Sequence, residues 1–317
     1  MSPRAFCLRS ANSLERHKDR FFLLVAFALC GIAVPVRGDE FCATRVAFEG
    51  GKTSEKLPGV TRSGPGIFVS VRLDGKDDNL RFLFDTGAGR TVIERNVAAR
   101  LGLRPTAKSS IGGVGAGRVD VDVVKGASLR LGKVRLNGVD LHVADIPEFE
   151  HVDGIIGYDL LCSTVVIFDS KEPSIVVTTP STFQYQGSGD VLPLQIRGRW
   201  PFVEGTIKVT GRPAVIDNFL IDSGSQDAVN HPIIRQSKGQ LRETSTGSGG
   251  FGKSLSGVIG PNEWFRIGST TIPATTSVCC AASEEVSRQL GAGILSRFRI
   301  TFNYPQGKMI LAKYSDR

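Results

Sequence analysis

Residues 82–88 read FLFDTGA and residues 219–225 read FLIDSGS. Each phrase is an apolar run, typical of a buried strand, that ends in Asp, a hydroxyl residue and Gly. A single carboxylate after a strand is common, and Asp-Thr-Gly or Asp-Ser-Gly often forms a turn. Two such phrases in matching frames predict instead two half-sites, in which Asp85 and Asp222 come together to share one proton and one water.

The similarity between the two halves of the chain extends beyond these phrases. After each Asp comes a hydrophobic-Arg-hydrophobic-Gly phrase, at Leu129–Gly132 and again at Phe265–Gly268. Further on, the segments that begin at Gly157 and Gly291 align without a gap. A repeated order of landmarks indicates one structural unit present twice. We therefore expect two copies of one lobe in this chain.

Composition and pattern together predict the fold class and the domains. Short Val-, Ile- and Leu-rich runs bounded by glycine predict strands, and the clearest helical pattern is residues 91–103. A chain of 317 residues can hold two lobes that each bury a core. We expect a mostly β fold of two pseudo-symmetric β-barrel lobes with a cleft between them. The predicted domains are a signal peptide at residues 1–38, an N-terminal lobe at 39–178, a linker at 179–190 and a C-terminal lobe at 191–317.

The first 38 residues have the layout of a secretory signal. Basic residues precede an apolar run at residues 21–36, and the phrase Val36-Arg-Gly38 precedes the predicted cut. The run is short and is interrupted by Gly and Pro, so no stable membrane span is expected after cleavage. We expect an exported protein, periplasmic or secreted. An uncleaved N-terminal segment that tethers the chain to a membrane is the alternative.

Charge and cysteine content limit the partners. Without residues 1–38 the chain has 33 basic and 29 acidic residues, a net charge of +4. No cluster of Lys and Arg is interleaved with aromatic residues, so no nucleic-acid partner is expected. The remaining cysteines are Cys42, Cys162, Cys279 and Cys280. They allow three disulfide connectivities, with buried free thiols as the alternative. Their spacing fits no zinc motif, and neither a metal nor a cofactor is expected.

The two Asp phrases, with the apolar-Gly phrases that follow them, resemble the lobes of aspartic peptidases. Phe82–Ala88 is followed by Ile155-Ile156-Gly157, and Leu220–Ser225 is followed by Leu290-Gly291. Two fused lobes are similar to pepsin-like enzymes, whereas the lobe size and the Gly-rich segment 110–117 are similar to retropepsin-like enzymes. The resemblance covers nearly all of the chain after residue 38. It implies acid-protease-like β-barrel lobes in a bacterial-type, single-chain, retropepsin-like peptidase.

The resemblance implies an exported aspartic endopeptidase in which Asp85 and Asp222 are catalytic. Two carboxyl groups a few ångströms apart cannot easily both ionise, so they share one proton. The ionised carboxylate would take a proton from water, and the protonated one would polarise the scissile carbonyl group. The residues implied to support the dyad are Thr86, Gly87, Ser223, Gly224 and Ser225.

The family also places a flap over the substrate in each lobe. Residues 109–117 and 246–253 are the candidates, because glycine at a hairpin tip permits bending. The predicted flap or substrate-binding residues are Ile111, Gly112, Gly113, Gly249 and Gly250. The second half departs from the pattern at Gln289, where an apolar residue is expected before Leu290-Gly291.

The expected partner is a polypeptide substrate, and the chain is expected to act as a monomer because it contains both half-sites. Two alternatives stay open. One is a non-catalytic protein on the same fold that binds an extended peptide by strand addition. The other is a peptidase that is active only as a dimer of chains. Residues 39–65 fit either a propeptide or an N-terminal strand followed by a loop.

Overall fold

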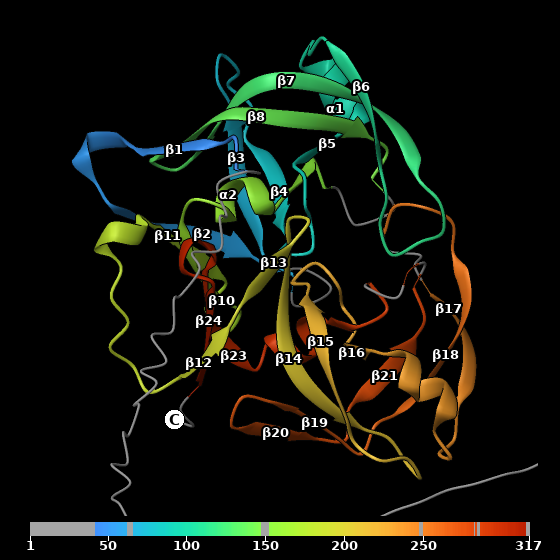
Figure 1. The fold of residues 1–317 in the computed structure, drawn as a ribbon. Coiled ribbons are helices and arrows are strands. Elements are labelled where there is room, and N and C mark those ends of the chain that lie inside the picture. The colour runs from blue at the N-terminus through green and yellow to red at the C-terminus, as the bar shows by residue number, and fades with distance from the viewer. Residues whose placement is uncertain are drawn as a thin grey trace, which may run out of the picture. The chain divides into compact units, whose positions relative to one another are not determined.

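A computed structural model of the chain describes residues 42–61, 66–146, 152–246, 250–281, 283 and 286–314. All of these residues belong to one compact unit that spans residues 37–317. The predicted signal peptide lies outside the described residues. Strands dominate the described part, and its helices are short (Figure 1). The prediction of a mostly β fold is therefore confirmed.

In the first half of the chain, the described residues form strands β1 to β11 and four short helical segments. The strands are β1 (Arg45–Phe48), β2 (Ser54–Val60), β3 (Phe68–Leu73), β4 (Leu80–Phe84), β5 (Val92–Glu94), β6 (Ala107–Ile111), β7 (Val119–Leu131), β8 (Val134–Ala144), β9 (Gly154–Ile156), β10 (Val165–Asp169) and β11 (Ser174–Thr178). The helical segments are η2 (Glu49–Gly51), α1 (Arg95–Arg100), α2 (Tyr158–Leu161) and η3 (Pro180–Thr182).

Among the residues that the structure describes in the second half, strands β12 to β24 and three short helical segments are present. The strands are β12 (Asp190–Pro193), β13 (Gln195–Arg197), β14 (Trp200–Lys208), β15 (Val215–Ile221), β16 (Val229–Asn230), β17 (Arg242–Thr246), β18 (Leu255–Pro261), β19 (Trp264–Ile267), β20 (Thr270–Pro273), β21 (Thr276–Cys279), β22 (Gln289–Leu290), β23 (Phe298–Asn303) and β24 (Lys308–Lys313). The helical segments are η4 (Pro232–Gln236), α3 (Ala292–Leu295) and η5 (Tyr304–Gln306).

The two halves repeat the same strand pairing around the Asp phrases. β3 pairs with β4 in antiparallel fashion, and β14 pairs with β15 in the same way. β4 then pairs in parallel with β9, as β15 does with β22. A one-turn helix follows each of these parallel partners, α2 after β9 and α3 after β22. The internal repeat read from the sequence is thus a repeat of topology, which confirms the two-lobed fold.

One sheet joins the two halves. Its strands run in the order β12, β24, β23, β10, β11, β2 and then continue into the first lobe. β10 and β23, the equivalent strands of the two copies, pair in antiparallel fashion, with Val165 opposite Asn303. Because this sheet crosses from one half to the other, the predicted lobe and linker boundaries stay predictions. The described residues 42–61 form β1, η2 and β2, which matches the strand alternative for residues 39–65.

Large aromatic side chains fill the core at equivalent positions. Phe82 and Phe219, three residues before each Asp, are fully buried, and so are Phe168 and Phe302 in the joining sheet. Phe84 stacks on Phe168 with 6.0 Å between ring centroids. Each fully buried Phe contributes about 1.5–3 kcal/mol through the hydrophobic effect. The apolar strands that end in Asp are therefore anchored to the core immediately before the carboxylates.

The helix predicted at residues 91–103 is shorter than expected. Val92–Glu94 form β5 instead, because they pair with β8 and β9 and complete the sheet beside the Asp loop. The helix begins only after Glu94, whose side chain accepts hydrogen bonds from the N–H groups of Asn96 and Val97. In the second lobe, η4 takes the place of this helix.

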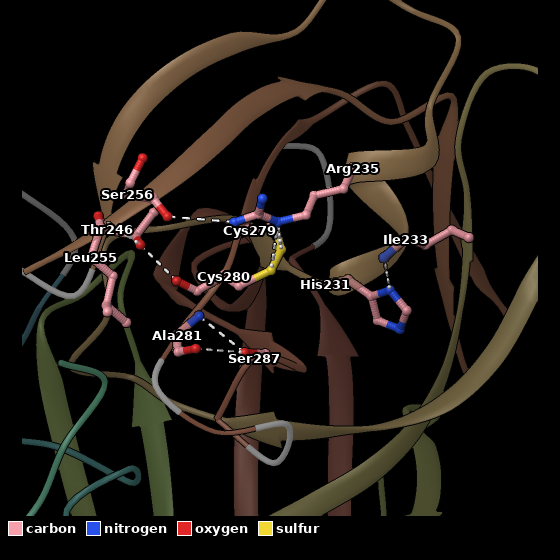
Figure 2. The surroundings of a disulfide bond; sticks show 10 residues. All are labelled: His231, Ile233, Arg235, Thr246, Leu255, Ser256, Cys279, Cys280, Ala281 and Ser287. Carbon is pink, nitrogen blue, oxygen red and sulfur yellow. Dashed lines mark hydrogen bonds between the residues drawn. A yellow bond between two sulfur atoms is a disulfide. The ribbon is translucent and has the colours of Figure 1, made fainter. Parts of the chain in front are cut away.

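The structure pairs Cys42 with Cys162 and Cys279 with Cys280, which is one of the three possible connectivities. The first pair ties the chain before β1 to the end of α2. Figure 2 shows the second pair, with the guanidinium group of Arg235 directed at both sulfur atoms. Within the described residues, no helix is long and apolar enough to cross a membrane.

Candidate active site

Each Asp of the repeated phrases lies directly after a core strand, Asp85 after β4 and Asp222 after β15. The parallel partner strand holds each of them in place. The N–H group of Asp85 donates to the carbonyl oxygen of Ile156 at 2.9 Å, and that of Asp222 donates to the carbonyl oxygen of Leu290 at 2.9 Å. The apolar-Gly phrase of each lobe therefore supports the loop that carries its carboxylate.

The glycines of the apolar-Gly phrases are required by close packing. A Cβ atom at Gly157 would lie 2.0 Å from the carbonyl oxygen of Asp85, and one at Gly291 would lie 2.3 Å from that of Asp227. Contacts this short cannot be relieved without moving the backbone of the Asp loop. Gly157 and Gly291 thus let the end of the partner strand pack closely against the Asp loop, which explains why each Asp phrase is followed by an apolar-Gly phrase.

Four hydrogen bonds made by the hydroxyl groups of Thr86 and Ser223 join the two Asp loops. The Thr86 hydroxyl donates to the carbonyl oxygen of Ile221 at 2.6 Å and accepts from the Ser223 N–H at 3.0 Å. The Ser223 hydroxyl donates to the carbonyl oxygen of Phe84 at 3.1 Å and accepts from the Thr86 N–H at 3.1 Å. Both side chains are buried. The bonds cross between the lobes in matching pairs and fix the loops to each other.

The structure brings the carboxyl groups of Asp85 and Asp222 together, and they share a hydrogen bond. Each also lies against the glycine of the other loop. A Cβ atom at Gly87 would be 2.5 Å from Cγ of Asp222, and one at Gly224 would be 2.5 Å from Cγ of Asp85. The Gly87 N–H donates to Oδ1 of Asp85 at 2.7 Å, and the Gly224 N–H donates to Oδ1 of Asp222 at 2.9 Å. Only glycine fits at these two positions.

Burial and mutual repulsion perturb both carboxyl groups. Burial raises the pKa of Asp85 well above its usual range, and the neighbouring charge of Asp222 raises it further. Burial also raises the pKa of Asp222, but hydrogen bonds from Asp85, Ser225, Gly224 and Gln289 oppose this increase. The two carboxyl groups therefore titrate as a pair, and the hydrogen bonds that favour an ionised carboxylate include a side-chain donor only at Asp222.

Ser225 and Gln289 make the remaining contacts with Asp222. The Ser225 N–H donates to Oδ1 of Asp222 at 3.0 Å, whereas its hydroxyl accepts from the N–H of Asp227. Ser225 thus supports the dyad through its backbone. The side-chain amide of Gln289 donates to Oδ2 of Asp222. The sequence shows Gln289 only as a departure from an apolar pattern, and this departure is the signal that finds it.

Tyr304 is a buried residue near the dyad that the sequence analysis does not identify. Burial, with smaller contributions from the charges of Asp85, Tyr158 and Asp222, raises its pKa well above the usual range, so the hydroxyl stays neutral. No repeat or motif marks this residue, because the lobe 1 counterpart in the aligned segments is Ser170. Within the described part of the chain, no group of His, Cys, Asp and Glu could hold a metal ion.

The predicted flaps are hairpin tips that touch each other. Ile111 ends β6 and is buried, and Gly112 and Gly113 begin the turn toward β7. Gly250 lies in the turn between β17 and β18, and Gly249 lies outside the described residues. Across the two tips, Ala116 and Lys253 exchange two backbone hydrogen bonds of 2.8 Å. The β6–β7 and β17–β18 hairpins approach each other on one side of the molecule (Figure 1).

Each tip also packs against an apolar cluster that includes a residue of the opposite lobe's Asp strand. Phe251 of the second tip contacts the apolar cluster that includes Leu83, two residues before Asp85. Val114 of the first tip contacts the cluster that includes Leu220, two residues before Asp222. A Cβ atom at Gly113 would lie 2.7 Å from the backbone nitrogen of Phe251, so the tips fit closely.

Comparisons with known proteins agree with this geometry. Residues 69–160, from β3 to α2, match the family model described as aspartyl protease. The chain is similar to the crystal structure of aspartic proteinase from Irpex lacteus, with a TM-score of 0.55 and 15% sequence identity over 83% of this chain and 98% of that one. A search of curated proteins finds no match.

The chain thus has the two-lobed fold of pepsin-like aspartic proteinases. The segment that contains Asp85 and the first predicted flap, residues 69–160, is similar to the aspartyl protease family.

Proposed function

We propose that the protein is an aspartic endopeptidase that hydrolyses peptide bonds through Asp85 and Asp222. One observation carries the proposal. The buried carboxyl group of Asp222 and the half-buried one of Asp85 share a hydrogen bond at the junction of two repeated lobes, and each lies against a glycine of the opposite loop. Perturbed carboxyl pairs of this kind are typical of acid–base sites. The family match of residues 69–160 supports the same class of reaction.

The proposed reaction begins with a water molecule between the carboxyl groups. Ionised Asp222 takes a proton from the water as the water oxygen bonds to the carbonyl carbon, and Asp85 gives its proton to the carbonyl oxygen. A neutral tetrahedral diol results. Asp222 then passes its proton to the amide nitrogen, the C–N bond breaks, and a hydroxyl of the diol returns a proton to Asp85. The products are a carboxylic acid and an amine, and the dyad is restored without a covalent intermediate.

The flap tips supply the remaining requirement, which is to hold an extended peptide and exclude water. Backbone N–H and C=O groups at Gly115, Ala116 and Lys253 now bond across the tips. Similar groups of an extended substrate can replace these partners by strand pairing. The proposed substrate is therefore a polypeptide bound in extended form, and no second chain is needed to complete the site. Elution as a monomer from a calibrated sizing column, with activity in that fraction, tests the last point.

Export to the periplasm or the medium is part of the proposal. The basic-apolar pattern of residues 1–38 supports it, and the pairing of Cys42 with Cys162 suits an oxidising compartment. Mass spectrometry of the exported protein tests it, with Asp39 expected as the first residue. Recovery of the chain only inside the cell, or with residues 1–38 retained, would contradict cleavage and export.

Cleavage of a broad peptide library between pH 3 and pH 8 tests the activity. Wild-type protein should cut, whereas Asp85→Asn and Asp222→Asn should each lose cutting, because either change removes the shared proton or the base. Mass spectrometry of the products identifies the bonds that are cut. If wild type binds library peptides but cuts none, the peptide-binding alternative replaces the peptidase.

A further inference from the structure

Gln289 occupies a position that is apolar in the first copy of the repeat. In lobe 2, Leu220 of β15 pairs with Gln289 of β22, and in lobe 1, Leu83 of β4 pairs with Ile155 of β9. Leu220 and Leu83 each lie two residues before an Asp of the dyad. Gln289 and Ile155 are therefore equivalent, and both are buried, with 2% and 7% of their surface exposed. A buried amide costs free energy unless it is hydrogen-bonded, so its partner identifies its role.

The partner of Gln289 is the carboxylate of the dyad. Its side-chain N–H donates to Oδ2 of Asp222, whose Oδ1 already accepts from the N–H groups of Gly224 and Ser225. Both oxygens of Asp222 therefore have donors from their own lobe. The Ser225 hydroxyl accepts from the Asp227 N–H instead of serving Oδ2.

The equivalent contacts of Asp85 are fewer. Its Oδ1 accepts from the Gly87 N–H at 2.7 Å, and the Gly224 N–H of the opposite loop also bonds to this carboxylate. The next N–H along, that of Ala88, donates to the backbone carbonyl oxygen of Asp85 at 3.2 Å. The side chain of Ile155, the equivalent of Gln289, has no group that can donate a hydrogen bond. The two halves of the dyad thus differ by one side-chain donor, although the loops around them repeat.

We propose that Gln289 is a positioning residue that holds the negative charge of the dyad on Asp222 and leaves the shared proton on Asp85. This inference rests on the proposed peptidase function and assigns the roles within it. A hydrogen bond donated to an ionised carboxylate stabilises that form over the protonated one. The amide does not titrate, so it acts at every pH. Asp222 thereby becomes the group that takes the proton from water, and Asp85 the group that polarises the carbonyl.

Other ionisable groups near Asp222 act in the opposite direction or not at all. The charges of Asp85 and Asp227 each repel a charge on Asp222. Tyr304, which also interacts with both dyad residues, remains neutral. Gln289 and the two backbone N–H groups therefore counteract the like charges that surround Asp222. Removal of Gln289 should make ionisation of the dyad harder.

The test is the pH dependence of kcat/KM for Gln289→Met, which keeps an unbranched side chain of similar length and lacks the donor. Its acid limb should move to higher pH by about one unit, the shift expected for loss of a hydrogen bond to an ionised group. Ile155→Met is the matched control, since it places the same side chain at the equivalent position and removes no donor. Its acid limb should stay where the wild-type limb lies.

A direct titration separates this inference from the peptidase proposal. The carboxyl carbons of 13C-labelled Asp are followed by NMR from pH 2 to 8, with Asp222→Asn used to assign the dyad signals. If wild type cuts no peptide but the first dyad titration still rises in Gln289→Met, the peptidase proposal fails and the role of Gln289 stands. If wild type cuts and neither the acid limb nor the titration moves by more than about 0.3 units, the role of Gln289 is refuted.

Gln289→Glu provides a second variant if the Met variant does not fold. A protonated Glu still donates a hydrogen bond to Asp222, whereas an ionised Glu repels it. The ratio of variant to wild-type kcat/KM should therefore be highest at low pH and fall as pH rises. In the titration, the dyad should retain its proton to higher pH than in wild type. If the ratio does not vary with pH and the dyad titrates as in wild type, the proposal is refuted.

Discussion

Replacement of Thr86 by Val tests whether the bonds between the Asp loops hold the two lobes together. The side chain is fully buried and has nearly the same shape in both residues. The change removes the Thr86 hydroxyl, which accepts from the Ser223 N–H at 3.0 Å and donates to the Ile221 carbonyl oxygen at 2.6 Å. Both backbone groups then lose this partner. Each buried group left unpaired costs about 1–3 kcal/mol. We therefore expect the free energy of unfolding to fall by about 2–6 kcal/mol, a large part of a typical domain's stability.

Urea unfolding at fixed pH, followed by Trp fluorescence, measures this loss. Thr86→Ser is the control, because it keeps the hydroxyl and removes only a methyl group, which costs about 1 kcal/mol. The Val variant should therefore unfold at clearly lower urea than the Ser variant, with lower kcat/KM as the carboxyl groups lose their alignment. If the two variants unfold within about 0.5 kcal/mol of each other, the cross-loop bonds do not stabilise the site as argued.

Three further predictions follow from the same contacts. Gly87→Ala places a methyl group 2.5 Å from Cγ of Asp222, and the displaced carboxyl should lower kcat/KM about 100-fold or more, as measured by steady-state kinetics. Because the pKa values of both dyad carboxyls are raised by folding, their contribution to stability is present at low pH and is lost as pH rises through the folded-state pKa. Asp85→Asn should thus raise Tm relative to wild type more at pH 7 than at pH 4, and a difference that does not change with pH would contradict this. Reduction of the bridge between Cys42 and Cys162, which closes a separation of 120 residues, should lower the free energy of unfolding by about 3 kcal/mol; paired Ser variants that unfold at the wild-type urea concentration would exclude this bridge.

The sequence predicts the parts of this fold that repeat. Asp85 and Asp222 are found because strand, carboxylate, hydroxyl and glycine recur in one order, and the apolar-Gly phrases are found because Gly157 and Gly291 have no room for a Cβ atom. These features depend on short-range backbone geometry. A local pattern therefore reports them reliably.

Features that depend on contacts between distant segments escape the pattern. Residues 91–95 read as helix, yet pairing with β8 and β9 makes Val92–Glu94 a strand. The sheet that joins the lobes through β10 and β23 has no local signature. The role of Gln289 depends on a carboxylate far away in the chain. Tertiary pairing overrides local propensity in the first case and creates new contacts in the other two.

The central claim is that Asp85 and Asp222 act as one unit, and a double-mutant comparison tests it most directly. With a peptide that wild type cuts, kcat/KM is measured for Asp85→Asn, Asp222→Asn and the double variant, each verified as folded by its urea midpoint. The account predicts that each single variant loses about 1,000-fold or more and that the double variant is no worse than either, because residues acting together are not additive. A single variant that keeps a tenth of wild-type activity, or losses that multiply in the double variant, would contradict the shared dyad.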